Sequence, residues 1–107
     1  MKILLVGSSG GHLTHLWMLK PFWSKYDRAW VTFPKEDAQS LLKNEKMYSC
    51  YYPTNRNLIN AIRNTFMAFK VLRQEKPDLI ISSGAAVAAS YFWVGKLFYK
   101  TKNIYIE

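Results

Sequence analysis

The chain has 107 residues, half of them hydrophobic and 16% aromatic, so it can bury one small core and is not a disordered chain. Fifteen Lys and Arg oppose seven Asp and Glu, and the formal charge of +8 favours an anionic partner: nucleic acid, an acidic membrane or a phosphorylated ligand. The lone cysteine, Cys50, excludes an internal disulfide framework. We expect a single domain over 1–107.

Short apolar runs alternate with segments of helical period along the chain. They predict strands at 2–6, 29–33, 47–52, 78–82 and 103–106, and helices at 13–25, 35–44, 57–75 and 85–100. Strands separated by helices predict a parallel sheet covered on both faces. We therefore expect an α/β, Rossmann-like, doubly wound fold with strand order 3-2-1-4-5. Because no helix follows the fifth strand, we also expect the C-terminal part of the domain to be missing.

The first predicted strand runs directly into a glycine-rich turn, Gly7-Ser8-Ser9-Gly10-Gly11-His12, which opens the first predicted helix. Free backbone N–H groups at such a turn suit a phosphate or another anion. The spacing is neither G-x-G-x-x-G nor a P-loop, so a purely structural turn is the alternative. His12 is a candidate base or hydrogen-bond donor, whereas His15 is expected to pack or meet solvent. Two histidines without clustered acidic partners predict no metal site.

Further candidates follow the other strands. With strand order 3-2-1-4-5, the ligand crevice opens between the first and fourth strands, at their carboxyl ends. Ser83 and Gly84 follow the fourth strand, Arg56 follows the third, and Glu107 ends the fifth. Arg56 is either a phosphate clamp or a solvated arginine at a helix start. Glu107 is either a base or hydroxyl acceptor, or an inert chain end.

The helix predicted over 57–75 carries an apolar stripe at steps of three and four residues, which predicts a core-facing side. Its members are Ile59, Ile62, Phe66, Phe69 and Leu72. A basic flank repeats every seventh residue at Arg56, Arg63 and Lys70. Lys76-Pro77 is expected to end this helix.

The helix predicted over 85–100 mixes aromatic and basic residues. They are Tyr91, Phe92, Trp93, Lys96, Phe98, Tyr99 and Lys100, and Lys102 follows. This mixture is typical of a segment at an anionic lipid interface, but the same aromatics also suit a core or a subunit contact. Trp17, Phe22 and Trp23 add to the membrane interpretation. The apolar stretch over 84–99 is too short to span a bilayer.

Four motifs in order resemble one family. They are Gly7-Ser8-Ser9-Gly10-Gly11-His12, Pro53-Thr54-Asn55-Arg56-Asn57, the segment 77–88 that contains Ser82-Ser83-Gly84, and the final Ile104-Tyr105-Ile106-Glu107. The family comprises the acceptor-side subunit of the two-part UDP-N-acetylglucosamine transferase of dolichol-linked glycan synthesis and its bacterial capsular and exopolysaccharide counterparts. The third motif favours the bacterial branch.

The resemblance implies the N-terminal half of a GT-B glycosyltransferase that is split over two chains. It would bind a lipid-diphosphate-linked saccharide at the cytoplasmic face of the plasma membrane and recruit a donor-binding partner that holds most of the UDP-sugar site. Gly10, Gly11 and His12 would lie near the acceptor diphosphate, with His12 as the base, and Glu107 matches the family's glutamate. The membrane contact would be peripheral, and no cofactor is implied.

Two other functions remain open. In the first, the chain is a non-catalytic adaptor that docks a catalytic partner to the membrane, and the glycine turns only shape the fold. In the second, it binds nucleic acid, which rests on the +8 charge alone, since the sequence carries no nucleic-acid module signature.

Overall fold

The structure, a computed structural model, describes residues 1–7, 11–33, 35–49, 58–82 and 91–105. Its sheet contains β1 (Lys2–Val6), β2 (Asp27–Thr32), β3 (Met47–Ser49), β4 (Leu79–Ser82) and β5 (Lys102–Tyr105). Neighbouring strands pair in parallel in the order β3-β2-β1-β4-β5. The predicted fold class and strand order are therefore confirmed.

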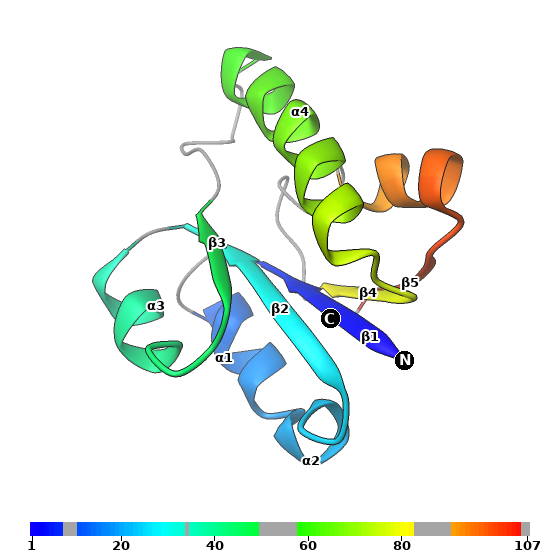
Figure 1. The fold of residues 1–107 in the computed structure, drawn as a ribbon. Coiled ribbons are helices and arrows are strands. Elements are labelled where there is room, and N and C mark those ends of the chain that lie inside the picture. Colours follow the sequence, from blue (N-terminus) through cyan, green and yellow to red (C-terminus); the bar gives the residue numbers. More distant parts are fainter. Residues whose placement is uncertain (8–10, 34, 50–57, 83–90, 106–107) are drawn as a thin grey trace.

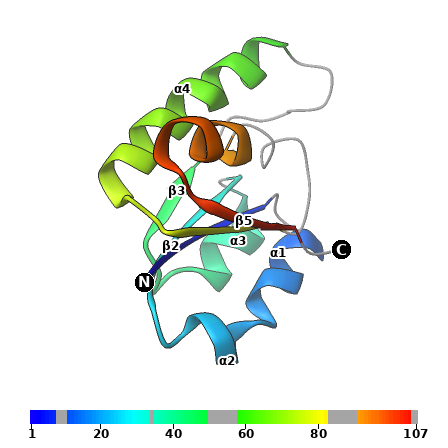
Figure 2. The ribbon, with the colours of Figure 1, turned by 90° about the vertical axis from the view of Figure 1, so that its right-hand side faces the viewer.

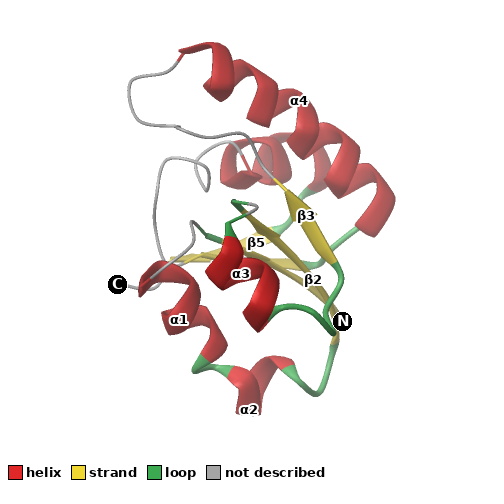
Figure 3. Cartoon of the chain, turned by 90° about the vertical axis from the view of Figure 1, so that its left-hand side faces the viewer, coloured by secondary structure: helices red, strands yellow, loops and turns green. Residues whose placement is uncertain are grey.

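Helices cover both faces of this sheet (Figures 1 and 3). On one face lie α1 (Gly11–Trp17), α2 (Lys20–Trp23) and α3 (Glu36–Leu41). On the other lie α4 (Leu58–Glu75) and a C-terminal helical segment, residues 91–99, whose last part is the π-helix η1 (Gly95–Tyr99). Figure 2 shows this segment beside α4, and the rings of Phe69 and Phe98 meet there with centroids 4.9 Å apart.

Alternate residues of each strand enter two cores, as a strand's two-residue period requires. Leu4 and Val6 of β1 pack with residues of α4 and with Tyr91, whereas Ile3 and Leu5 pack with residues of α1, α2 and α3. Continuous apolar strands are therefore explained by burial on both faces.

The helix predicted over 13–25 is two helices, α1 and α2, with a break after Trp17. Pro21 lies in the first turn of α2, where its missing N–H is tolerated. A continuous helix would instead press the Pro21 ring against the carbonyl of Trp17, four residues earlier. At the break, the carbonyl of Leu16 accepts two hydrogen bonds, one of 3.1 Å from the N–H of Leu19 and one of 2.9 Å from the Trp23 indole.

The tryptophans of α1 and α2 belong to the core, which corrects their assignment to a membrane contact. Trp23 is fully buried, and its ring lies 5.2 Å from Trp30 and 5.3 Å from Trp17. Trp17 is half-buried against the same core. Of Trp17, Phe22 and Trp23, only Phe22 is exposed.

The apolar stripe predicted to face the core from α4 is wrong for its first half. Ile59, Ile62 and Phe66 are 64%, 48% and 71% exposed, and burial becomes substantial only at Phe69 and Leu72. Figure 1 shows the reason: the N-terminal half of α4 extends beyond the strands, so no sheet lies beneath it. The helix face that does meet the core carries Asn64, Ala68, Val71, Leu72 and Glu75.

The end of α4 follows the sequence prediction. Its last residue is Glu75, and Lys76 takes a left-handed conformation with φ of 49° before Pro77. The Lys76 N–H still bonds to the carbonyl of Leu72 at 2.8 Å, which closes the final turn.

Candidate functional site

The carboxyl ends of β1, β4 and β5 lie side by side. Val6 pairs with Ser82, and Ser82 pairs with Tyr105. The chain leaves β1 through Gly7, which is buried and donates its N–H to the carbonyl of Val31 at 3.0 Å. The segments that follow β1 and β4 thus start from adjacent points, where a doubly wound sheet of this order places its ligand crevice.

The described residues cover part of the predicted site. Gly7 follows β1 directly, and Gly11 is the first residue of α1. His12 lies in the first turn of α1, and its side chain is outside the described residues. Also outside them are Ser8, Ser9, Gly10, Arg56, Ser83, Gly84 and Glu107. The roles of all these residues stay predictions.

The sheet order separates one of the predicted segments from the rest. The segment that holds Arg56 follows β3, which is the edge strand, and β2 lies between β3 and β1. Strands in a sheet are spaced by about 4.8 Å, so this segment starts roughly 10 Å from the β1 turn. An arginine side chain can cross that distance only if the segment turns towards β1.

Thr32 is a candidate that sequence analysis missed. It ends β2, next to the β1 exit, and is fully buried. Its Oγ1 has no hydrogen-bond partner among the described residues. A buried hydroxyl normally has one, so this oxygen is available to a group at the strand ends. In the sequence, Thr32 was marked only as the one hydroxyl-bearing residue in the otherwise apolar run 29–33.

A cluster of charged side chains lies near the amino ends of β1 and β3, at the end of the sheet opposite the candidate site. Glu75, at the end of α4, is almost fully buried, and its carboxylate lies 2.7 Å from Nζ of Lys2 and 2.6 Å from Nζ of Lys46. The hydroxyl of Tyr48 also donates to it. Burial alone would raise the pKa of Glu75, but these hydrogen bonds outweigh it and lower the pKa to about 2. The cluster joins α4 to β1 and β3, so its role is structural.

A second carboxylate, that of Glu45, also has a structural role. Glu45 receives hydrogen bonds from Nε of Arg28 at 2.7 Å and Nη2 of Arg28 at 3.0 Å, and from the Trp30 indole at 2.9 Å. Burial opposes ionisation, but the bonds from Arg28 and Trp30 lower the pKa of Glu45. Arg28 in turn lies over the Trp23 ring, 4.7 Å from its centroid. This carboxylate therefore anchors the tryptophan core.

The described ranges contain neither a cluster of metal ligands nor a membrane-spanning helix. No three His, Cys, Asp or Glu side chains of those ranges lie close enough to hold a metal ion. In the same part of the chain, no helix has the length and apolar character needed to cross a bilayer.

In sequence, the chain matches no protein-family model and no curated protein. Solved structures do match it. MurG of Acinetobacter baumannii superposes with a TM-score of 0.74 at 18% identity, over 97% of this chain and 34% of MurG. UDP-GlcNAc 2-epimerase of Methanocaldococcus jannaschii superposes with a TM-score of 0.74 at 17% identity, over 100% of this chain and 31% of the epimerase.

A third match has another activity in its name. The C-terminal domain of the PF1911 hydrogenase of Pyrococcus furiosus superposes with a TM-score of 0.70 at 18% identity, over 99% of this chain and 90% of that domain. At such identities, similarity establishes the fold and not the activity. The chain thus spans about a third of the length of MurG and of the epimerase. It shares a Rossmann-like α/β fold with MurG, with the epimerase and with the PF1911 domain.

Proposed function

We propose that this chain is the acceptor-side subunit of a UDP-sugar-dependent glycosyltransferase of polysaccharide synthesis. The observation that carries the proposal is the coincidence of motif order and sheet order. Two of the four family-like motifs follow β1 and β3, and the other two contain β4 and the end of β5. Parallel pairing brings the carboxyl ends of these strands to one edge of the sheet. The chain shares its fold with MurG and with a UDP-GlcNAc 2-epimerase, and this similarity supports a UDP-sugar as the donor.

In the proposed reaction, the acceptor is a saccharide linked to undecaprenyl diphosphate. Backbone N–H groups at Gly10 and Gly11, with the loop after β4, stabilise the diphosphate charge. His12 takes the proton of the acceptor hydroxyl, whose oxygen forms a bond to the anomeric carbon of the donor sugar. The bond from that carbon to the UDP oxygen breaks, and UDP leaves with the electron pair. Glu107 assists by accepting a hydrogen bond from the sugar or the acceptor.

The donor half of the enzyme is proposed to come from a second chain, as in the family that the motifs resemble. In the family that the motifs resemble, that partner chain holds most of the UDP-sugar site. We expect the purified chain to give no turnover with UDP-sugar and acceptor. Turnover by the chain alone would contradict the two-chain proposal.

The acceptor is lipid-linked, so the proposal includes peripheral contact with an anionic membrane. The C-terminal helical segment carries exposed Trp93, Leu97 and Phe98 together with exposed Lys96, and exposed Lys100 follows it. Aromatic and aliphatic side chains beside lysines favour binding at the interface of an anionic bilayer. Only part of this segment packs into the core, through the buried side chains of Tyr91 and Val94.

The test of catalysis is His12→Ala in the chain reconstituted with its donor-binding partner. Loss of a general base typically costs 100-fold or more in rate, and we expect kcat to fall by about that factor. His15→Ala is the matched control, because His15 is an exposed histidine of the same helix. It should leave kcat within about twofold, while both variants should bind the partner equally.

The same experiment decides between catalysis and the adaptor alternative. A subunit that only docks its partner to the membrane would keep kcat within about threefold in His12→Ala, a change below about 0.7 kcal/mol. That result, with partner binding intact, would contradict the catalytic role of His12 and favour the adaptor.

A further inference from the structure

Two side-chain hydroxyls lie on neighbouring strands at the carboxyl ends of β2 and β3. Thr32 pairs with Ser49 in the parallel register of these strands, so both side chains lie on the same face of the sheet. Thr32 is fully buried, whereas Ser49 is exposed. One covered and one open hydroxyl therefore lie about one strand spacing, ~4.8 Å, apart.

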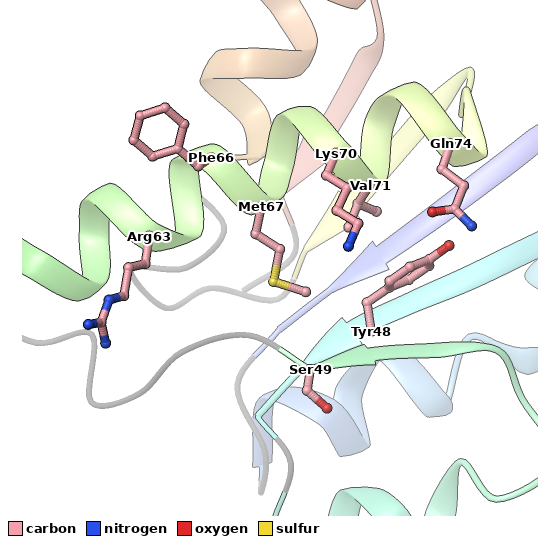
Figure 4. Close-up of a pocket in the computed structure, with 8 residues that line it drawn as sticks. All are labelled: Tyr48, Ser49, Arg63, Phe66, Met67, Lys70, Val71 and Gln74. Carbon is pink, nitrogen blue, oxygen red and sulfur yellow. The ribbon is translucent and has the colours of Figure 1, made fainter.

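The face that carries this pair is the one covered by α1, α2 and α3. Trp30 and Met47, two positions earlier on each strand, pack in the core beneath those helices. In Figure 4 the side chain of Ser49 points away from α4, whereas that of Tyr48 points towards it. The two hydroxyls therefore face away from α4 and the C-terminal helical segment, which is proposed to contact the membrane.

Gly7 extends this row of residues on the β1 side. Val6 pairs with Val31, and the Gly7 N–H bonds to the Val31 carbonyl at 3.0 Å, so Gly7 lies beside Thr32. Since glycine has no side chain, Gly7 leaves room next to the Thr32 hydroxyl. The acceptor diphosphate is proposed to lie at the turn that follows Gly7. From there, the row leads over Thr32 to Ser49, a distance of about 10 Å.

The Thr32 hydroxyl has no hydrogen-bond partner within the part of the chain that the structure describes. A buried hydroxyl without a partner destabilises a fold, so its presence indicates a partner that arrives with a ligand. A hydroxyl donates one hydrogen bond and accepts others, and neither Thr32 nor Ser49 is charged. This pair matches the hydroxyls of a sugar, which also donate and accept, better than it matches a phosphate, which only accepts.

We propose that Thr32 and Ser49 form a saccharide subsite, which binds the sugar unit next to the acceptor diphosphate. The subsite rests on the proposed function, because it requires the diphosphate at the β1 turn. From there, the lipid extends towards the α4 face and the membrane, and the sugar lies over Gly7 against the two hydroxyls. Thr32 is covered in the free chain, so its hydroxyl gains a hydrogen bond only when the acceptor enters.

The binding test compares citronellyl diphosphate with its glucosyl and N-acetylglucosaminyl derivatives, by calorimetry on the full chain. We expect one of the sugar derivatives to bind the parent chain at least tenfold more tightly than the bare diphosphate. Thr32→Val should reduce this preference to less than threefold and leave binding of the bare diphosphate within twofold. Thr32→Ser keeps the hydroxyl and should keep the preference. An undiminished preference in Thr32→Val would overturn the subsite.

Urea unfolding of the free chain gives a second readout, which does not depend on the proposed function. Thr32→Val removes an unpaired hydroxyl at similar side-chain volume and should raise the urea midpoint. Thr101→Val is the matched control, because Thr101 is also buried but its hydroxyl bonds to Asn103 at 3.0 Å. It should lower the midpoint and leave the sugar preference unchanged. A lower midpoint for Thr32→Val would show that its hydroxyl is already bonded in the free chain, and would overturn the subsite.

Failure of the subsite can be told apart from failure of the proposed function. If none of the three diphosphates binds, the proposed acceptor role is wrong, and the subsite is wrong with it. If the bare diphosphate binds and neither sugar strengthens its binding, the subsite is wrong while the acceptor role is supported.

Discussion

At the scale of the single residue, Glu75 connects three elements through one carboxylate. It ends α4, and its partners Lys2, Lys46 and Tyr48 belong to or adjoin β1 and β3. Its pKa of about 2 in the fold lies below the ordinary 4.5, so the folded chain holds the charged form more tightly than the unfolded chain does. By linkage, this carboxylate contributes about 3 kcal/mol at neutral pH.

Because folding lowers the pKa of Glu75, we predict that the free energy of unfolding depends on pH. Stability from Glu75 is present above pH 4.5 and is lost as the pH falls from about 4.5 through about 2. Glu75→Gln should lower the free energy of unfolding at pH 7 by about 2–3 kcal/mol. It should also flatten the decline between pH 4.5 and 2, as measured by urea unfolding over that range.

Glu36→Gln provides the control, since Glu36 is an exposed carboxylate at the start of α3. It should change stability by no more than about 0.5 kcal/mol. If Glu75→Gln keeps the full acid dependence of the parent chain, the acid sensitivity comes from other carboxylates and the assignment to Glu75 is wrong.

At the scale of the element, η1 depends on a glycine. A Cβ added at Gly95 would lie 2.8 Å from Cδ1 of Ile80 and closer still to Oγ1 of Thr101. Thr101 itself is anchored, because its N–H bonds to the Gly95 carbonyl at 3.1 Å and its hydroxyl bonds to Asn103 at 3.0 Å. The π-helix can therefore approach β4 and β5 only with glycine at this position.

Gly95→Ala should accordingly destabilise the chain, although alanine favours helices. Overpacking typically costs about 1–3 kcal/mol, which exceeds the helix-propensity gain of about 1 kcal/mol. Urea unfolding would measure the difference. Lys96→Ala, an exposed neighbour in η1, should stay within about 0.5 kcal/mol. A Gly95→Ala variant as stable as the parent chain would show that η1 can shift away from β4.

The helices and strands also show what the sequence could and could not predict. Continuous apolar runs predicted β1 and β4 because burial on both faces removes the usual alternation. The period of α4 predicted a helix with an apolar stripe, but a period does not tell where the sheet beneath it ends. Ile59 and Phe66 are therefore exposed, and the buried face includes Glu75, whose cationic partners are distant in sequence.

The candidate site was predictable to a similar degree. Alternating strands and helices predict a doubly wound parallel sheet, and the order 3-2-1-4-5 locates its crevice at the ends of β1 and β4. Thr32 was not predictable, because only the structure shows that its hydroxyl is buried and lacks a hydrogen-bond partner among the described residues. A cavity between α4 and β3, whose lining includes Tyr48, Arg63 and Lys70, likewise joins residues of two elements, although the seven-residue spacing of Arg63 and Lys70 did indicate a basic side of the helix.

At the scale of the whole molecule, the two faces of the sheet differ in what they leave exposed. The α4 face carries Trp93, Leu97 and Phe98 on the C-terminal helical segment, and Ile59, Ile62 and Phe66 on α4. The other face exposes Met18 and Phe22, while its tryptophans are buried or half-buried. Together with the net charge of +8, this difference supports the proposal that the molecule contacts an anionic bilayer through the α4 face.

Vesicle binding tests this orientation with a matched pair of surfaces. Trp93→Ser/Leu97→Ser removes two side chains whose burial is worth about 1.5–3 kcal/mol each, so partitioning into anionic vesicles should fall at least tenfold. Met18→Ser/Phe22→Ser, on the opposite face, should change it less than twofold. High salt should weaken binding of the parent chain, because the electrostatic attraction is screened. Equal losses from both faces would show that vesicles bind the chain without a preferred orientation, since contact through the α4 face alone cannot involve Met18 or Phe22.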